Sequence, residues 1–213
     1  DTMTISVKCK TGNQKKLVNS IKENEVTICS GPAGTGKTYL ACAEALKLIK
    51  RYRKYKKVVI VKSVTTLKNE EIGFLKGGLR EKMEPFMFSF VHNFEKLVGQ
   101  AITQRLRELK TIEEMPIAYM RGINLDRSII IVDEAQNISQ ENMRTIMTRL
   151  GKDSKMIFLG DERQQDSKGG NGLTFLMDHF QDIDGIGCVQ FNKADVVRNP
   201  LIAKIERVFD SIG

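Results

Sequence analysis

The sequence predicts an α/β protein in which a mostly parallel β-sheet is flanked by helices. Short apolar segments with strand character alternate along the chain with stretches whose apolar residues recur at helical spacing. The clearest unit is a strand over 26–30, a glycine-rich loop over 31–38 and a helix over 39–49. Because ligands in such folds bind outside the carboxyl ends of the strands, we expect the functional residues there.

The first half of the chain holds one more strand and several helical stretches. A short helical pattern covers 13–21, and a strand that is apolar on both faces covers 57–62. Residues 64–80 lack clean periodicity, whereas 81–97 and 100–115 show helical spacing, so we predict a helical insertion over about 64–115. The Phe and Met residues of 81–97 favour a helix core over a surface for base stacking.

The second half repeats the alternation of strand and helix. The strongest strand signal of the chain lies at 128–133, and a helix is predicted to follow from about 139 to 150. The remaining elements are a strand over 155–160, a flexible glycine loop over 169–172, a strand over 186–191 and an amphipathic helix over 200–212.

Composition sets broad limits on the class of protein. A length of 213 residues, with 41% hydrophobic and 28% charged residues, suits one globular domain over 1–213. No apolar run approaches the length of a membrane span, so we expect no contact with a membrane. The four cysteines are scattered without metal-ligand spacing, which favours a reduced, cytoplasmic protein.

The charge of the chain is basic and unevenly distributed. The net charge is +8, and seven of the eleven residues from 47 to 57 are Lys or Arg. Such a run permits a polyanionic partner such as nucleic acid. It also fits a solvated helix end, because the negative end of the helix dipole favours cations. The second interpretation is the better supported of the two.

The loop at 31–38 carries the pattern G-x-x-x-x-G-K-[ST] of a phosphate loop (P-loop). Its glycines permit backbone conformations and close approaches that a Cβ would block, and the helix that follows directs N–H groups at phosphate. Lys37 is expected to reach the β- and γ-phosphates, and the Thr38 hydroxyl to ligate Mg²⁺. The predicted nucleotide-binding residues are Gly31, Pro32, Ala33, Gly34, Thr35, Gly36, Lys37, Thr38 and Tyr39.

A pair of carboxylates closes the strand over 128–133. Asp133 stands at the tip of this strand, where it is expected to hold Mg²⁺ beside Thr38. Glu134 is expected to polarise a water molecule against the γ-phosphate. Adjacent acids of this kind favour hydrolysis over phosphoryl transfer to a small acceptor. A helix-capping role for the pair is the weaker alternative.

Two further polar residues are candidates for the same site. If the strand over 155–160 lies between the P-loop strand and the Asp133 strand, Gln164 can sense the γ-phosphate. Arg198 could supply the positive charge that phosphoryl transfer requires, although a lone Arg is more often a surface residue.

An ordered set of motifs resembles the PhoH family over roughly residues 13–209. The set comprises Asn13-Gln14, GPAGTGKT at 31–38, GFL at 73–75, YMRG at 119–122, IIIVDEAQN at 129–137, GDERQQD at 160–166 and DVVRNP at 195–200. The resemblance implies an ATPase with a RecA-like P-loop NTPase core, with ATP and Mg²⁺ as ligands. It also implies that Gln14 reads the adenine, that Gln164 senses the γ-phosphate and that Arg198 is an arginine finger.

The chain departs from the family pattern at 62–63, where Lys-Ser replaces the usual Arg-Pro. Its compact, Lys-rich form looks like the stand-alone proteins of some bacteriophages, in which case the host cytoplasm is the expected location.

The leading hypothesis for function is a Mg²⁺-dependent ATPase that moves on or remodels nucleic acid, with single-stranded RNA as the expected partner. A helicase-like motor needs two RecA-like units, so we expect a homo-oligomer, such as a hexameric ring, with Arg198 facing a neighbour's ATP. One alternative is an ATP-dependent switch or assembly factor that works through protein partners. A small-molecule kinase is disfavoured by the two adjacent acids and the lack of an Arg-rich lid.

Overall fold

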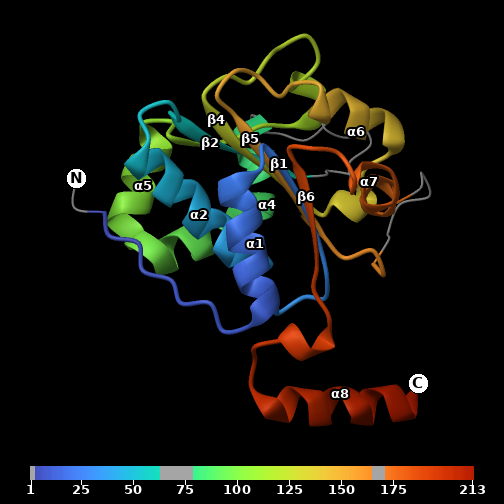
Figure 1. Ribbon diagram of the computed structural model, residues 1–213. Coiled ribbons are helices and arrows are strands. Elements are labelled where there is room, and N and C mark those ends of the chain that lie inside the picture. Colours follow the sequence, from blue (N-terminus) through green and yellow to red (C-terminus); the bar gives the residue numbers. More distant parts are fainter. Residues whose placement is uncertain (1–2, 63–78, 165–170) are drawn as a thin grey trace.

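A single parallel sheet forms the centre of the molecule (Figure 1). A computed structural model gives the positions of residues 3–62, 79–164 and 171–213. Within these residues six strands pair in the order β3-β2-β4-β5-β1-β6, and every pairing is parallel. The strands are β1 (Val26–Ser30), β2 (Lys57–Lys62), β3 (Ile112–Glu114), β4 (Ser128–Asp133), β5 (Lys155–Gly160) and β6 (Ile186–Gln190). The predicted α/β fold with a parallel sheet is confirmed.

Strand β3 corrects the prediction of one helix over 100–115. The helix α5 (Gln100–Glu108) ends at Leu109, and Lys110 takes a left-handed conformation with φ of 57°. The chain turns there, and residues 112–114 pair with β2 at the edge of the sheet. An edge strand of three residues has too few alternating positions for its pattern to be separated from that of a helix end.

Helices cover both faces of the sheet, because successive strand residues point to opposite sides. On β4, Ile129 and Ile131 belong to one apolar cluster, whereas Ile130 and Val132 belong to another. Each cluster is covered by its own group of helices (Figure 1). These are α1 (Gly12–Glu23), α2 (Lys37–Arg51), α4 (Leu79–Val98) and α5 on the first face, and α6 (Gln140–Met147) and α7 (Gly172–Phe180) on the second. Burial on both faces explains why the central strands are continuous apolar runs.

The aromatic side chains of α4 lie in the core, as the helical spacing predicts. Met87, Phe90 and Phe94 are at most 1% exposed and pack in the first cluster. The interpretation of this stretch as helix core is therefore confirmed for these residues. The side chains of Met83 and Phe86 lie outside the described part of the chain.

Helix α7 begins inside the stretch 169–172 that was predicted as a glycine loop. Asn171 caps α7, and Gly172 is the first residue of that helix, which the sequence patterns did not indicate. Residues 64–78 and 165–170, which hold the other predicted loop positions, lie outside the described residues. Helix α6 is also shorter than the predicted 139–150, because it begins after the capping residue Ser139 and ends at Met147.

The last helix, α8 (Pro200–Ile212), has the predicted bounds and stands apart from the body of the molecule (Figure 1). None of its residues is buried. The described residues also form the 3-10 turns η1 (Ile117–Tyr119), η2 (Ala135–Asn137) and η3 (Lys193–Asp195), of which η2 and η3 matter for the site. Of the helices that the structure describes, none combines the length and the apolar character needed to cross a membrane.

Candidate nucleotide-binding site

The P-loop joins the carboxyl end of β1 to the first turn of α2. Gly34 and Gly36 have φ of +80° and +82°, a region that residues with a Cβ rarely adopt. Gly31 is needed for a different reason, because a Cβ at this position would lie 2.4 Å from the Cβ of Phe191. Two glycines therefore shape the loop, and the third lets it pass close to the end of β6.

The amino terminus of α2 carries no side-chain cap. Helices α1, α6, α7 and α8 each begin with a side chain that accepts from a backbone N–H, supplied by Thr11, Ser139, Asn171 and Asn199. Helix α5, which follows Gly99, begins without such a cap. At α2 the capping position is Gly36, and no side chain accepts from the first N–H groups. Those donors and the positive end of the helix dipole suit phosphate oxygens. The residues of the loop thus fit a nucleotide.

Lys37 is folded against the loop that it belongs to. Its ammonium donates to the Gly31 and Pro32 carbonyls at 2.9 and 2.8 Å. Burial lowers the pKa of Lys37 below its ordinary value, and the carboxylates of Asp133 and Asp161 act in the opposite direction. The side chain therefore holds a positive charge close to two acids in a partly desolvated place, which is the environment of a phosphate ligand.

Strand β5 lies between β1 and β4. This strand order is the one that the sequence analysis required for Gln164 to reach the site. This order brings the ends of the three strands together around one cleft of about 300 Å³. Its lining residues are Ala33, Gly34, Thr35, Gly36, Lys37, Thr38, Tyr39, Asn93, Asp133, Glu134, Gln136, Gly160, Asp161 and Gln164. Most of the P-loop and both predicted acids thus face the same space.

The two acids leave β4 in different conformations. Asp133 is the last residue of the strand, and Glu134 has φ of 53° and ψ of 42°, which is left-handed. For a residue with a long side chain this conformation costs of order 1 kcal/mol, and such residues concentrate at functional sites. The turn sets Glu134 off the line of the strand while both side chains line the cleft.

Gln14 lies behind the P-loop instead of lining the cleft. Its buried amide donates to the Thr35 carbonyl at 2.9 Å and accepts from the backbone N–H of Lys10 at 2.6 Å. The residue therefore supports the loop in this structure, and its role in reading adenine stays a prediction.

Arg198 lies beside the P-loop of its own chain. A Cβ built on Gly34 would lie 3.6 Å from Arg198 Cδ, and the backbone N–H of Val197 donates to the Gly34 carbonyl at 2.8 Å. The guanidinium forms an ion pair with Glu206 of α8 at 2.9 Å. Its role as an arginine finger stays a prediction.

Contacts far apart in the sequence tie the two ends of the chain to the P-loop. The Asn13 amide donates to the Asp195 carboxylate at 2.8 Å, 182 residues away. Asp195 is 5% exposed and also accepts from the backbone N–H of Asn192. Burial raises its pKa, but hydrogen bonds from Asn13, Asn192 and Thr11 outweigh burial and hold the pKa below its ordinary value. This junction fixes η3, which precedes Val197 and Arg198.

Four cleft residues, Gly160 and three with polar side chains, were not singled out by the sequence. Asn93 arrives from α4, Gln136 from η2 and Asp161 from the end of β5. The Gln136 side-chain oxygen accepts from the backbone N–H of Asp161 at 3.2 Å, which joins the ends of β4 and β5. Gln136 and Asp161 fall inside quoted motifs, so their motif positions were a usable signal. Asn93 had no signal because it lies on a helix of ordinary core pattern.

The donor set also fits Mg²⁺. Thr38 contributes a hydroxyl and Asp133 a carboxylate, and both line the cleft. Magnesium in proteins is commonly held by one or two such oxygens together with phosphate and water. These two residues would hold the ion next to a bound triphosphate.

Comparison with known proteins gives consistent matches over nearly the whole chain. The family model described as "PhoH: PhoH-like protein" matches residues 6–210. The PhoH-like protein of Bacillus subtilis (strain 168) is 40% identical over 207 residues, which cover 96% of this chain and 64% of that protein. The PhoH-like protein of Mycobacterium tuberculosis (strain H37Rv) is 36% identical over 202 residues, or 94% of this chain and 57% of that protein. The chain spans less than two thirds of these relatives.

Solved structures with the same fold share little sequence with the chain. The large terminase of a thermophilic bacteriophage, in complex with ADP, has a TM-score of 0.53 at 10% identity over 92% of this chain and 49% of that chain. The Pyrococcus furiosus Hef helicase domain has a TM-score of 0.51 at 15% identity over 86% of this chain and 38% of that chain. These neighbours establish the P-loop NTPase fold for the chain.

Proposed function

The chain belongs to the PhoH-like protein family, and from this premise we propose that it is a magnesium-dependent ATP hydrolase. Its proposed action is on nucleic acid, with single-stranded RNA as the main substrate, as an oligomeric helicase-like motor. The observation that carries the proposal is the single cleft in which the P-loop meets Asp133, Glu134 and Gln164. Nucleotide binding at this cleft is also supported by the first N–H groups of α2, which no side chain caps.

The P-loop and the polar residues predicted from the sequence each have one role in the proposed reaction. The P-loop N–H groups hold the phosphates, and Lys37 exchanges its loop carbonyls for β- and γ-phosphate oxygens. Glu134 accepts a proton from the attacking water as the water oxygen bonds to the γ-phosphorus and the bond to ADP breaks, giving ADP and phosphate. Gln164 contacts the γ-phosphate. Magnesium, held by Thr38 and Asp133, neutralises charge on the phosphates when it is bound.

The test of this reaction is the substitution Glu134→Gln. The change removes the proton acceptor and keeps the shape of the side chain, so turnover should fall by about 10²- to 10⁴-fold. Binding of a fluorescent ATP analogue should change little, because the P-loop remains. Phosphate release and analogue binding are measured on the same preparations.

A matched control for this test is Glu162→Gln. Glu162 follows β5 and does not line the cleft that holds Glu134; it lines a neighbouring pocket together with Gly31 and Pro32 at the start of the P-loop. Its variant removes an acid from the same edge of the sheet and should turn over ATP within about twofold of the parent. Normal turnover in the Glu134 variant would remove Glu134 from the mechanism.

Arg198 is the proposed arginine finger in an assembly of several chains. Its side chain is 39% exposed and pairs with Glu206, which is 55% exposed, so a nearby nucleotide could recruit it from this surface ion pair. Native mass spectrometry with and without an ATP analogue should detect an oligomer. Finding the monomer alone under both conditions would contradict the motor.

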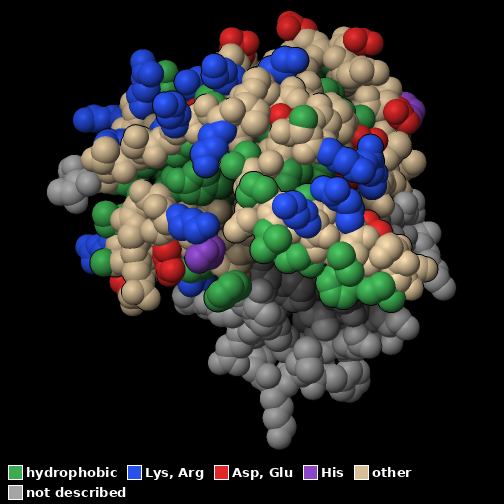
Figure 2. All heavy atoms as spheres, turned by 90° about the horizontal axis from the view of Figure 1, so that it is seen from below, with side chains coloured by type: hydrophobic (Ala, Val, Ile, Leu, Met, Phe, Trp, Pro, Cys, Tyr) green, Lys and Arg blue, Asp and Glu red, His purple; other side chains and the backbone are tan. Residues whose placement is uncertain are grey.

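A second candidate function is an ATP-dependent switch that works through protein partners. It is favoured by α8, where large apolar side chains are 45–76% exposed along the helix. Figure 2, which views the molecule from the side of α8, shows these apolar side chains next to Lys and Arg. The exposed residues are Leu201, Ile205, Val208, Phe209 and Ile212.

Phosphate release with and without single-stranded RNA, at a fixed salt concentration of about 0.1 M, separates the two functions. Stimulation of several-fold supports the motor. Clear basal turnover with no response to RNA supports the switch.

A further inference from the structure

Positive charge is concentrated at the edge of the sheet opposite the nucleotide cleft. The segments that lead into β1 to β6 cover 22–25, 51–57, 110–113, 126–127, 152–155 and 182–185, and they hold ten basic and seven acidic residues. The segments that follow β1, β4, β5 and β6 cover 31–38, 133–136, 160–164 and 190–198, and they hold four basic and five acidic residues. The amino-edge segments therefore have a charge of +3, with five of the basic residues in 51–57, whereas these carboxyl-edge segments have a charge of −1.

Backbone contacts hold the basic segments of the amino edge side by side. The Arg127 guanidinium donates to the Lys54 carbonyl at 3.0 Å and to the Arg53 carbonyl at 2.6 Å. The backbone N–H of Lys56 donates to the Arg127 carbonyl at 2.7 Å, and the backbone N–H of Arg127 donates to the Lys152 carbonyl at 2.8 Å. Residues from three separate parts of the sequence thus form one basic surface.

We call this surface the amino-edge patch and define it by Arg51, Tyr52, Arg53, Lys54, Lys56, Arg127 and Lys152.

The acids near the amino-edge patch do not neutralise its exposed cations. Glu113 pairs with Lys57 at 3.0 Å, and Asp126 accepts from the backbone N–H of Lys152 at 2.8 Å. Within the described parts of the chain, no ion pair joins an acid to Arg51, Arg53, Lys54 or Lys56, all of which are exposed. Their charge is available to an external anion.

An exposed aromatic ring lies among these cations. Tyr52 is 41% exposed and meets the ring of buried Tyr55 edge-on, with 6.2 Å between ring centroids. Arg51 Cζ lies 5.3 Å and Lys54 Nζ 5.9 Å from the centre of the Tyr52 ring. An aromatic ring surrounded by cations is the arrangement on which bases stack while phosphates pair with charge.

We propose that the amino-edge patch binds the sugar–phosphate backbone of a single-stranded nucleic acid, with Tyr52 stacking on a base. The negative end of the α2 dipole accounts for cations near Arg51. It does not account for Arg127 and Lys152, which precede other strands, or for the exposed ring. The inference deepens the proposed function by placing its nucleic-acid partner away from the cleft, and binding at this patch does not require hydrolysis.

The experiment measures binding of a fluorescent oligouridylate of roughly 20 nucleotides, without ATP, as the salt concentration is raised. The patch variant combines Arg53→Gln, Lys54→Gln and Lys56→Gln. The loss of three phosphate contacts should make the negative slope of log K against log[salt] less steep by about 2. It should weaken binding about 100-fold near 0.1 M salt. Retained binding of a fluorescent ATP analogue shows that the variant is folded.

The charge-matched control combines Lys8→Gln, Lys15→Gln and Lys96→Gln, three exposed lysines outside the patch. It removes the same total charge and should keep the parent slope. Equal losses in the control and the patch variant would mean that net charge alone attracts the strand, which overturns the proposal.

Tyr52→Leu separates stacking from charge. It should weaken oligouridylate binding roughly tenfold and leave the salt slope unchanged. Unchanged affinity for the oligouridylate would mean that Tyr52 does not stack on a base.

Two further outcomes are decisive. If the patch variant loses binding to phosphatidylserine vesicles and keeps binding to the oligonucleotide, the partner is an anionic membrane and the proposal is wrong. If the parent protein binds the strand through the patch but RNA does not stimulate phosphate release, the inference stands and the motor function fails.

Discussion

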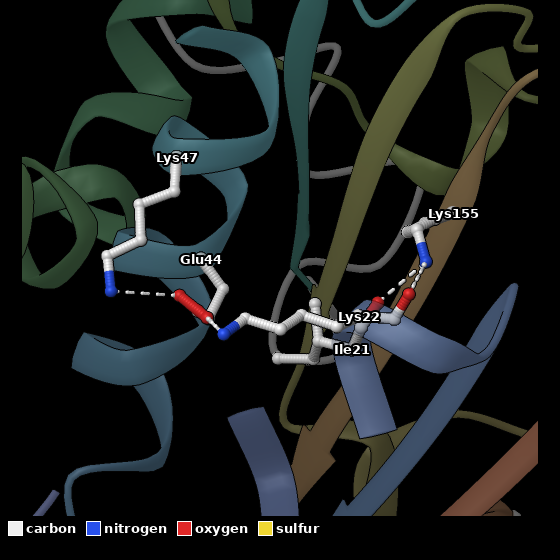
Figure 3. Close-up of polar contacts among 5 residues, drawn as sticks. All are labelled: Ile21, Lys22, Glu44, Lys47 and Lys155. Carbon is white, nitrogen blue, oxygen red and sulfur yellow. Dashed lines mark hydrogen bonds and ion pairs between the residues drawn. The ribbon is translucent and has the colours of Figure 1, made fainter. Parts of the chain in front are cut away.

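Two lysines at opposite edges of the sheet, the half-buried Lys37 and the buried Lys155, donate to the same kind of partner but have different roles. At the carboxyl edge, Lys37 donates to the Gly31 and Pro32 carbonyls. At the amino edge, Lys155 donates to the carbonyls of Ile21 and Lys22 at 2.7 and 3.1 Å (Figure 3). It also donates to the Asn24 carbonyl at 2.8 Å. Burial is the main cause that lowers the pKa of both side chains.

The difference lies in which helix end each lysine meets. In a parallel α/β sheet the helices begin at the carboxyl edge and end at the amino edge. Lys155 caps the carboxyl terminus of α1, where unpaired carbonyls and the negative dipole end favour a cation. Lys37 stands at the amino terminus of α2, whose uncapped N–H groups favour an anion. Its carbonyl partners can be exchanged for phosphate.

A second set of charged contacts, around Glu44, also has a structural role near the end of α1. Glu44 of α2 is 2% exposed and lies 3.9 Å from Lys22 and 3.2 Å from Lys47 (Figure 3). It links α2 to the same turn of α1 that Lys155 caps. Lys155 holds α1 to β5 and Glu44 holds α2 to α1, whereas the charges around Lys37 face a cleft. The comparison teaches that ammonium–carbonyl contacts alone do not distinguish a structural lysine from a functional one.

The largest expected effect that separates the two lysines is that of Lys37→Met. Removing charged contacts to phosphate should weaken ATP binding roughly 10- to 100-fold and abolish turnover. The melting temperature should stay the same or rise, because a partly desolvated charge is removed. Titration with a fluorescent ATP analogue and thermal unfolding give the two readouts. Unchanged affinity would contradict the assigned role of Lys37.

The matched substitution Lys155→Met should have the opposite profile. It leaves the carbonyls at the end of α1 without their donor, which should cost about 2 kcal/mol of unfolding free energy. For a chain of this length the melting temperature should fall by roughly 4–8 °C. Affinity for the ATP analogue should be unchanged in the folded protein. If the Lys155 variant lost as much affinity for the ATP analogue as the Lys37 variant, the two lysines would not differ in function.

A smaller effect sharpens the comparison within the carboxyl edge. Asp195→Asn replaces a carboxylate that accepts hydrogen bonds from Asn13 and Asn192, and it should cost about 1 kcal/mol at neutral pH. Because the folded-state pKa of Asp195 lies below its ordinary value of 3.8, its contribution is present above that pH. The contribution is lost as pH falls through the folded-state pKa. Denaturant unfolding at several pH values measures this.

The parent protein and the Asp195→Asn variant should therefore differ in unfolding free energy at neutral pH, and this difference should disappear in acid. A difference that stays constant down to the acid limit would show that the carboxylate charge is not what stabilises η3.

Much of the fold was predictable from local pattern. Five strands were located because buried parallel strands are continuous apolar runs, and the P-loop was identified because its glycines and Lys37 have fixed spacing. Strand β3 and helix α7 were missed because each is short, and short segments give weak periodicity.

The candidate site was predictable only in part. The P-loop and Asp133 with Glu134 carry spacing that a single stretch of sequence reveals, and both acids line one cleft with most of the loop. Asn93 could not be singled out, because the apolar pattern of α4 does not indicate which turn of the helix faces the P-loop. Lys155 gave no signal either, since a lysine at the start of a strand is usually solvated.

The sequence by itself determined the parallel α/β fold, the phosphate loop and the acids that end β4, because each depends on residues close together in the chain. Only the tertiary structure decided that β5 separates β1 from β4, that Asn13 meets Asp195, and that the carbonyls of α1 receive Lys155. The physical reason is that these contacts depend on strand order and helix packing, which arise from burial summed over the whole core. Local spacing identifies the chemical groups, and packing determines which groups meet.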